Sequence, residues 1–193
     1  MNVNASVDVP ITESDAIDIL EKPKPTTLQK NVEASIVMTL LTIADTIIKN
    51  GDVVCQRMGI TTQQWRIMLH LASDPNLVFV QDNPRTEPIV ASELADALNV
   101  SRPNITNLIN SLTEKGMVLQ ITDKRDKRKK FLTLSEEGLR VLEIIEPFRR
   151  RANLRLMTAL SDDGKQVLLH SLRGCLDILT ADFGKLKGSF SII

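Results

Sequence analysis

The chain has 193 residues, of which 42% are hydrophobic, and its 24 basic and 24 acidic side chains give no formal net charge. No apolar run approaches the roughly 20 residues of a membrane-spanning helix. Residues 1–6 also lack the basic region and apolar core that start a signal peptide, so we expect a cytoplasmic protein of one or two small domains. The lack of tyrosine and the single tryptophan argue against an aromatic surface that stacks single-stranded nucleic acid.

The first segment, residues 1–27, is predicted to be an acidic arm followed by a linker. Between Met1 and Pro25 there are five acidic and two basic side chains, which give a net charge of −3. Lysine and proline alternate from Lys22 to Pro25, which is typical of a linker.

Residues 28–48 are predicted to form one long helix, which Asn50 and Gly51 should end because glycine is favoured just after a helix. Its apolar side chains form a wide surface, made of Ile36, Val37, Leu40, Leu41, Ile43, Ala44, Ile47 and Ile48. A second helix should begin after Thr61, where Gln64 completes a capping box. The predicted buried side of this helix consists of Trp65, Met68, Leu69 and Ala72.

Residues 74–90 carry the weakest pattern. The short apolar run Leu77–Val80 is typical of a β-strand, and Pro84 and Pro88 mark a loop.

A helix, a tight turn and a second helix are predicted next. Leu94, Ala95 and Leu98 share one face of the first helix, and Asn99 tolerates the left-handed conformation that a tight turn needs. Val100 should plug the turn into the core. Ser101 is a good N-cap, and Pro103 fits the first helical turn. The second helix should bury Ile105, Leu108, Ile109 and Leu112 and end at Gly116.

The opposite face of the second helix carries short, uncharged hydrogen-bonding side chains. Such side chains can approach the edges of DNA bases, and asparagine can pair with adenine through two hydrogen bonds. A merely solvated face is the alternative, but solvated faces usually carry Lys and Glu, and here neither occurs before Glu114. The candidate DNA contacts of this region are Ser101, Arg102, Pro103, Asn104, Thr106, Asn107 and Asn110.

Two strands with a basic turn between them follow the second helix. Met117–Ile121 and Lys129–Leu134 have strand-like patterns. From Asp123 to Lys130 there are six basic and two acidic residues, so this turn has a net charge of +4 and suits phosphate contact. The candidate DNA contacts here are Lys124, Arg125, Asp126, Lys127 and Arg128. Two helices joined by a tight turn, then a basic hairpin, constitute a winged helix-turn-helix.

Two more long helices are expected, one that Ser135 caps and that reaches about Leu156, and one that Ser161 caps. Together with the first long helix they present more apolar surface than one small domain can cover, so we expect a homodimer. The predicted fold is therefore mainly α with a small β-wing. Residues 61–138 form the winged helix-turn-helix DNA-binding domain, and residues 28–60 and 139–193 form a helical dimerisation region.

The sequence resembles the MarR regulators (multiple antibiotic resistance regulators) over roughly residues 28–186. The resemblance lies in LADALNVSRPNITNLINSLTEKG, in the wing pattern Asp-x-Arg-Asp-x-Arg, and in Leu-Thr-Leu-Ser-x-x-Gly after it. It implies a homodimer whose wing-tip arginine enters the minor groove, held by an aspartate two residues earlier. These positions fall on Arg128 and Asp126, although Arg125 or Lys127 can also be the inserted residue, and an exposed Asp–Arg pair can be a mere surface ion pair.

Two features depart from the resemblance. Residues 74–90 are longer than expected, and the small wing strand can start within them. Val90 stands where a capping Thr or Ser is expected.

The predicted function is sequence-specific binding of double-stranded DNA at a pseudo-palindromic operator, as a repressor that a small molecule releases. Leu41, Trp65 and Met68 are the candidate ligand pocket. The alternatives are a protein-interaction module that does not bind DNA, and a thiol-based oxidant sensor using Cys55 or Cys175. His70 and His170 lack ligand neighbours, so we expect no metal, no cofactor and no enzymatic activity. The acidic arm can be a tail, a short helix docked on the dimerisation helices, or a segment that competes with phosphate near the wing.

Overall fold

The computed structural model describes residues 31–82, 88–124 and 126–189, with side chains up to residue 181. The acidic arm therefore lies outside the described residues. The chain separates into two compact units, Met1–Ile48 and Lys49–Ile193. Within the described residues, no helix is long and apolar enough to cross a membrane. The helices are α2 (Val32–Cys55), α3 (Thr62–Leu71), α4 (Val78–Asp82), α5 (Ala91–Leu98), α6 (Arg102–Glu114), α7 (Glu136–Leu156) and α8 (Asp162–Ser189), with short 3-10 turns at Gln56–Met58 and Met157–Ala159.

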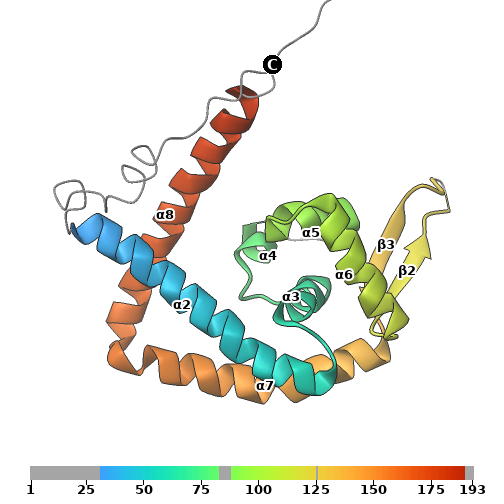
Figure 1. Ribbon diagram of the computed structural model, residues 1–193, viewed down its shortest axis with the longest axis horizontal. Helices are drawn as coiled ribbons and strands as arrows, with labels where there is room; N and C mark the ends of the chain where they lie inside the picture. The colour runs from blue at the N-terminus through green and yellow to red at the C-terminus, as the bar shows by residue number, and fades with distance from the viewer. Residues whose placement is uncertain (1–30, 83–87, 125, 190–193) are drawn as a thin grey trace, which may run out of the picture. The chain divides into compact units, whose positions relative to one another are not determined.

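A three-stranded antiparallel sheet completes the winged domain. The strands β1 (Ile89–Val90), β2 (Val118–Thr122) and β3 (Lys130–Leu134) lie in the order β1-β3-β2. Val118 lies opposite Leu134 and Thr122 opposite Lys130, so β2 and β3 form a hairpin that projects away from α3 and α5 (Figure 1). A mainly helical fold with a small β-wing is therefore confirmed, and both predicted wing strands lie within one residue of their expected bounds.

The core of the winged domain lies where α3, α5 and α6 meet the sheet. The side chains that are at most 1% exposed come from all four elements and are Ile67, Met68, Leu94, Ile105, Leu112 and Val118. Burial of each such side chain stabilises the fold by about 1.5–3 kcal/mol. Continuity of this cluster from helices to sheet makes the winged domain one packed body.

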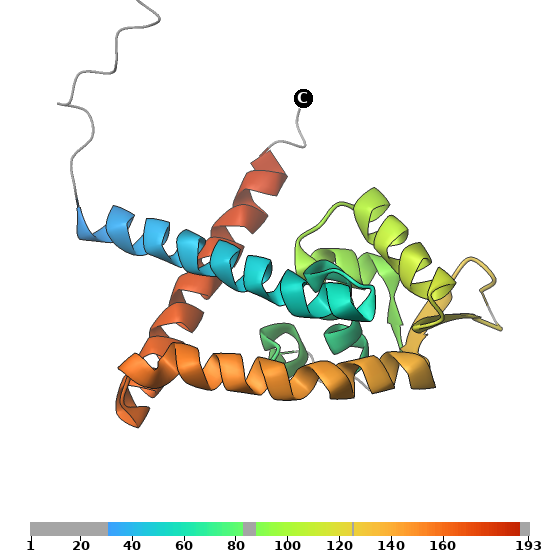
Figure 2. The same ribbon diagram turned by 60° about the horizontal axis from the view of Figure 1, so that its bottom comes forward.

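The start of α7 is fastened to the beginning of β2. The Ser135 hydroxyl donates to the Gly116 carbonyl oxygen at 2.6 Å and accepts from the Gly138 backbone N–H at 3.0 Å, as its predicted capping role requires. A Cβ atom on Gly138 would lie only 2.2 Å from the Met117 carbonyl oxygen, so only glycine allows this approach. Farther along, α7 passes alongside α3 (Figure 2) and buries Val141 and Ile145.

The prediction that α2 ends at Asn50 and Gly51 was wrong, because α2 continues to Cys55. Gly51 instead allows a close approach, since a Cβ atom there would lie 3.0 Å from the Thr62 Oγ1 atom. The Asp52 carboxylate accepts the Thr62 backbone N–H at 2.7 Å, which ties this end of α2 to the start of α3. The left-handed glycine that follows the helical segment is Gly59, with a φ of 70°.

The prediction of a strand at Leu77–Val80 was also wrong, because Val78–Asp82 forms the short helix α4. The Leu77 carbonyl oxygen accepts the backbone N–H groups of Val80 and Gln81, and the Phe79 ring packs edge-on against His70 with centroids 5.6 Å apart. A four-residue apolar run does not distinguish a strand from one turn of helix. The small wing strand lies later, at Ile89–Val90.

The starts of α3 and α5 are capped by different numbers of hydrogen bonds. The Thr61–Gln64 capping box is confirmed, with both reciprocal hydrogen bonds present. At Val90, which has no side-chain acceptor, the Glu93 carboxylate alone caps α5 by accepting the Val90 N–H at 3.1 Å. Of the side chains expected on the buried side of α3, Met68 and Leu69 are buried and Trp65 is half-buried, but Ala72 is the C-cap residue and is exposed.

An ion-pair network fastens the end of α3 to the middle of α7. The Asp74 side chain is only 7% exposed, and its Oδ2 atom lies 2.8 Å from Arg149 Nη1. Arg149 Nε lies 2.6 Å from Glu146 Oε2, one turn earlier on α7. Burial raises the pKa of Asp74, but hydrogen bonds from Asn76 and the charge of Arg149 outweigh it and hold the pKa below its ordinary value.

Removing the cation of this network should destabilise the protein in a pH-dependent way. Arg149→Met leaves the Asp74 carboxylate buried without its counter-ion, so we expect a loss of about 3 kcal/mol in unfolding free energy at pH 7. The lowered pKa of Asp74 contributes stability that is present above its ordinary pKa and is lost as the pH falls through the folded value. The gap between wild type and variant, measured by urea unfolding, should therefore narrow below about pH 4.

The adjacent arginine provides a matched control. The Arg150 side chain is 73% exposed and lies 3.6 Å from the same Glu146 carboxylate, so Arg150→Met should change the unfolding free energy by less than about 1 kcal/mol. If Arg149→Met lowered the unfolding free energy by the same amount at pH 7 and at pH 3, the loss would not come from the unpaired Asp74 carboxylate.

Candidate DNA-binding site

The helix-turn-helix unit is formed by α5, a tight turn and α6. Asn99 ends α5 with a φ of 51°, the left-handed conformation predicted for it. Val100 is half-buried against the core, and Ser101 has the extended backbone of an N-cap, although its hydroxyl makes no capping hydrogen bond. Pro103 lies in the first turn of α6, and Gly116 follows the helix with a φ of 70°. The predicted local geometry is thus confirmed apart from the Ser101 side chain.

The face of α6 opposite the core is exposed and polar. Ile105, Ile109 and Leu112 are buried, as predicted, and Leu108 is half-buried. The candidate contacts on the other face are all exposed, namely Ser101, Arg102, Pro103, Asn104, Thr106, Asn107 and Asn110. The exposed row therefore presents three carboxamides to the exterior.

Hydrogen bonds inside the protein leave these polar groups largely available. The Thr106 hydroxyl donates to the Arg102 carbonyl oxygen at 2.8 Å, and its oxygen can still accept a hydrogen bond. Among the hydrogen bonds of the described residues, none engages the carboxamides of Asn104, Asn107 or Asn110, which are all exposed. A carboxamide without a protein partner can offer both its donor and its acceptor to one base.

The wing turn is braced from within by its two aspartates. The Asp123 carboxylate accepts the Asp126 N–H at 3.0 Å, and the Asp126 carboxylate accepts the Arg128 N–H at 3.0 Å. The Asp123 N–H also reaches the Lys129 carbonyl oxygen at 2.9 Å. Both carboxylates thus bond to backbone groups, so the acidic residues of the turn shape the loop that carries the cations.

The described cations of the wing are exposed and can meet an anionic partner. The Arg128 side chain is 97% exposed, and its Nε atom lies 4.0 Å from Asp126 Oδ1, so Asp126 fixes the backbone of Arg128 more closely than its guanidinium. Lys124 and Lys127 are also exposed, whereas Arg125 lies outside the described residues. Lys129 and Lys130 are exposed too, although neither was predicted from the sequence to contact DNA.

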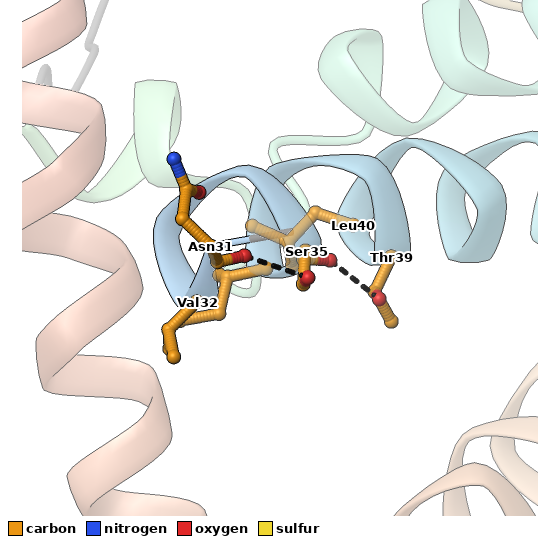
Figure 3. A pocket seen from close by; sticks show the side chains of 6 residues that line it. Asn31, Val32, Ser35, Thr39 and Leu40 are labelled. Atoms are coloured by element: carbon orange, nitrogen blue, oxygen red, sulfur yellow. Dashed lines mark hydrogen bonds between the residues drawn. The ribbon is translucent and has the colours of Figure 1, made fainter. Parts of the chain in front are cut away.

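The candidate ligand pocket stays a prediction. Met68 is fully buried and Trp65 half-buried in the core of the winged domain, whereas Leu41 is exposed and belongs to the other unit. The hollow in Figure 3 is lined by Asn31, Val32, Ser35, Ile36, Thr39 and Leu40, residues next to or on the first turns of α2. Because these residues are all exposed, this hollow is open surface.

The cysteines and histidines do not form a chemical centre in the part of the chain that the structure describes. Burial raises the pKa of the Cys55 thiol, which opposes thiolate formation, and Cys175 is exposed on α8. Burial, followed by the charge of Arg66, lowers the pKa of His70, whose Nδ1 atom has no hydrogen-bond partner. No group of three His, Cys, Asp or Glu residues suited to a metal ion occurs among the described residues.

Comparisons with known proteins agree with this geometry. Residues 58–129 match the model of the MarR family. The chain is 30% identical to the transcriptional activatory protein BadR of Rhodopseudomonas palustris over 136 residues, which are 70% of this chain and 71% of that protein. It is 27% identical to the homoprotocatechuate degradative operon repressor of Escherichia coli over 54% of this chain and 62% of that protein.

Solved structures share the fold. A MarR protein from Peptoclostridium difficile has a TM-score of 0.69 and 22% identity, covering 82% of this chain and 96% of its own. The S. aureus MepR protein in a DNA complex has a TM-score of 0.64 and 19% identity, covering 77% of this chain and 99% of its own. The helix-turn-helix, the basic wing and a relative that is 30% identical over more than two thirds of its length agree, and the chain therefore belongs to the MarR family and is a DNA-binding transcriptional regulator.

Proposed function

We propose that the protein binds a pseudo-palindromic operator as a homodimer, with α6 in the major groove and the wing over the adjacent minor groove. The observation that carries this proposal is the exposed face of α6, where three carboxamides have no hydrogen-bond partner among the described residues and no acidic side chain precedes Glu114. An α-helix fits the major groove, where each base pair presents a distinct pattern of donors and acceptors. Asn104, Thr106 and Asn107 are the proposed base contacts.

The wing supplies affinity that does not depend on sequence. Its described cations are exposed, and each phosphate contact releases counterions from the DNA. A narrow minor groove concentrates negative potential and attracts arginine, and the Arg128 side chain is almost fully exposed. Asp126 positions Arg128 through its backbone N–H. We place Arg128 at the minor groove, with Arg125 or Lys127 as the alternative.

Three variants separate recognition of bases from attraction to phosphate. Asn107→Ala should weaken binding to a selected operator by about 1–3 kcal/mol and leave binding to random duplex nearly unchanged. Arg128→Ala should weaken binding to both DNAs and reduce the salt slope by about one charge. Asp126→Ala should act like Arg128→Ala but less severely. Fluorescence anisotropy titrations at several salt concentrations measure these effects.

The control is Arg140→Ala, which removes an exposed cation that pairs with Glu137 on α7, a helix to which we assign no DNA contact. It should leave both affinities unchanged. An equal loss on both DNAs for Asn107→Ala would make Asn107 a backbone contact. Unchanged titrations for Arg128→Ala and Asp126→Ala would transfer the wing-tip role to Arg125 or Lys127.

The first unit supports assembly through α2. Its apolar side chains are exposed to an extent unusual for a helix of a stable protein, with Ile36, Val37 and Leu41 each 55% exposed. The hydroxyls of Ser35, Thr39, Thr42 and Thr46 donate to carbonyl oxygens one turn earlier in the same helix, two of them visible in Figure 3. Burying α2 in a second copy would therefore leave none of these hydroxyl donors unpaired.

The second unit offers a similar surface on α8. Its exposed large hydrophobic side chains are Val167, Leu169, Leu172, Leu176, Ile178 and Leu179. Such patches on two helices from opposite ends of the chain support a dimer that both ends build.

Dimerisation is tested by placing a charge within the apolar side of α2. Leu40→Glu should shift the protein from dimer to monomer in sedimentation velocity at micromolar concentration, because the buried carboxylate would have no partner. Lys49→Glu, on the more polar side of the same helix, is the control and should remain dimeric. A wild-type protein that sediments as a monomer at this concentration would contradict the proposal.

The regulation that we propose is repression relieved by a small molecule, as expected from the sequence. A relative named as an operon repressor supports repression, and the relative named as an activatory protein makes activation the second candidate. Trp65 is the residue of the predicted pocket that we propose to contact the ligand, because it is only half-buried whereas Met68 is fully buried. A ligand that binds this pocket should raise the melting temperature of the wild type, raise that of Trp65→Ala less, and release the protein from its operator. If the ligand releases the operator but raises both melting temperatures equally, the pocket lies elsewhere.

A further inference from the structure

Two glutamine side chains from neighbouring elements hold α6 along its opposite edges. The Gln64 Nε2 atom, on α3, donates to the Ser111 Oγ atom at 3.0 Å. The Gln120 Nε2 atom, on β2, donates to the Thr113 Oγ1 atom at 3.2 Å. At about 100° of rotation per residue, Ser111 and Thr113 lie about 160° apart around the helix axis. They therefore flank the buried face of α6.

Gln64 is only 3% exposed, and both its Nε2 and its Oε1 atom form hydrogen bonds within the protein. Its Oε1 atom accepts the Thr61 backbone N–H at 3.0 Å and the Lys115 Nζ atom at 3.3 Å. Lys115 Nζ also donates to the Gly59 carbonyl oxygen at 2.6 Å. One buried side chain thus caps α3 and contacts two residues near the end of α6.

Apolar packing and hydrogen bonding restrain a helix differently. Burial of Ile105, Ile109 and Leu112 holds α6 against the core, but the hydrophobic effect is non-directional. Hydrogen bonds weaken steeply as their angles worsen, so bonds on both edges oppose rotation in either sense. Because side chains end about 5 Å from the helix axis, a rotation of about 20° would move them by about 2 Å, more than a paired carboxamide and base can tolerate.

We propose that Gln64 and Gln120 are positioning residues that fix the rotation of α6 about its axis and thereby determine base specificity. They act through Ser111, Lys115 and Thr113, and Gln64 is too deeply buried to touch DNA. The inference rests on the proposed contact of α6 with bases. It adds two residues outside α6 and the basic turn of the wing that govern which sequence is bound.

The decisive quantity is the specificity ratio, which is the dissociation constant for random duplex divided by that for the selected operator. Gln64→Met keeps the length of the side chain but loses all three hydrogen bonds, so the ratio should fall about tenfold while the affinity for random duplex stays within about threefold. Gln120→Met should lower the ratio in the same way. Ser111→Ala removes the bond from the α6 side and keeps the α3 cap intact, so it carries the test if Gln64→Met does not fold.

Substitution by glutamate distinguishes the two edges. Gln64→Glu keeps an acceptor for Thr61 and Lys115, and the Ser111 hydroxyl can donate to the new carboxylate, so the ratio should recover to near the wild-type value. Gln120→Glu should not recover it, because the Thr113 hydroxyl already donates to the Ile109 carbonyl oxygen at 2.9 Å and needs a donor. Loss of stability alone does not predict this asymmetry.

Ile109→Val is the control for stability, because it thins the buried face of α6 without touching either edge. It should lower the melting temperature and leave the ratio within about threefold of the wild type. The inference would be overturned, and the proposed function left intact, by either of two results. The first is an unchanged specificity ratio for Gln64→Met, Gln120→Met and Ser111→Ala. The second is a ratio for Ile109→Val that falls as far as theirs. A wild-type ratio near one would overturn both.

Discussion

Burial of one face of α6 is the constraint on which the rest of the structure depends. Ile105 and Leu112 are at most 1% exposed, and together they contact a core that α3, α5 and β2 share. Each such side chain contributes about 1.5–3 kcal/mol, so α6 cannot leave the core without unfolding the winged domain. Because one face is held inside, the opposite face is presented outward with a fixed set of side chains. The base recognition that we propose for α6 would follow from this amphipathic arrangement together with the polar bonds at its edges.

The wing and α7 are both attached to the packed core that holds α6. β2 begins directly after α6, with Val118 in the core and the hairpin register carrying the chain out to the basic turn and back. Ser135 and Gly138 then join α7 to the carbonyl groups of Gly116 and Met117, and Asp74 pairs with Arg149 farther along. The helix that leaves the winged domain is thus anchored at two places. A change in the position of α7 would therefore act on the winged domain through Ser135 and the Asp74–Arg149 pair.

Most of the winged domain could be predicted because its signals are local. The left-handed turn at Asn99, the Thr61–Gln64 capping box and the alternating wing strands depend on neighbouring residues. Errors arose where a distant residue decides: Gly51 allows Thr62 to approach instead of ending α2, and the Leu77–Val80 run forms a helix that packs Phe79 against His70. The contacts of Gln64 with Ser111 and Lys115 span 47 and 51 residues, which no local pattern shows. The proposed DNA contacts rest on surface chemistry, which the sequence shows well, whereas no local sequence pattern marks a ligand pocket.

Selection of bound duplexes from a random pool, followed by sequencing, tests most directly whether the exposed face of α6 and the basic wing act together on DNA. The expected result is an enriched pseudo-palindrome whose half-sites lie about 10 bp apart, one helical turn, as two copies of α6 require. A/T-rich positions should flank each half-site, where a narrow minor groove accepts the wing arginine. A pool that gains no common sequence after repeated rounds, although the protein is folded and dimeric, would contradict base recognition by α6.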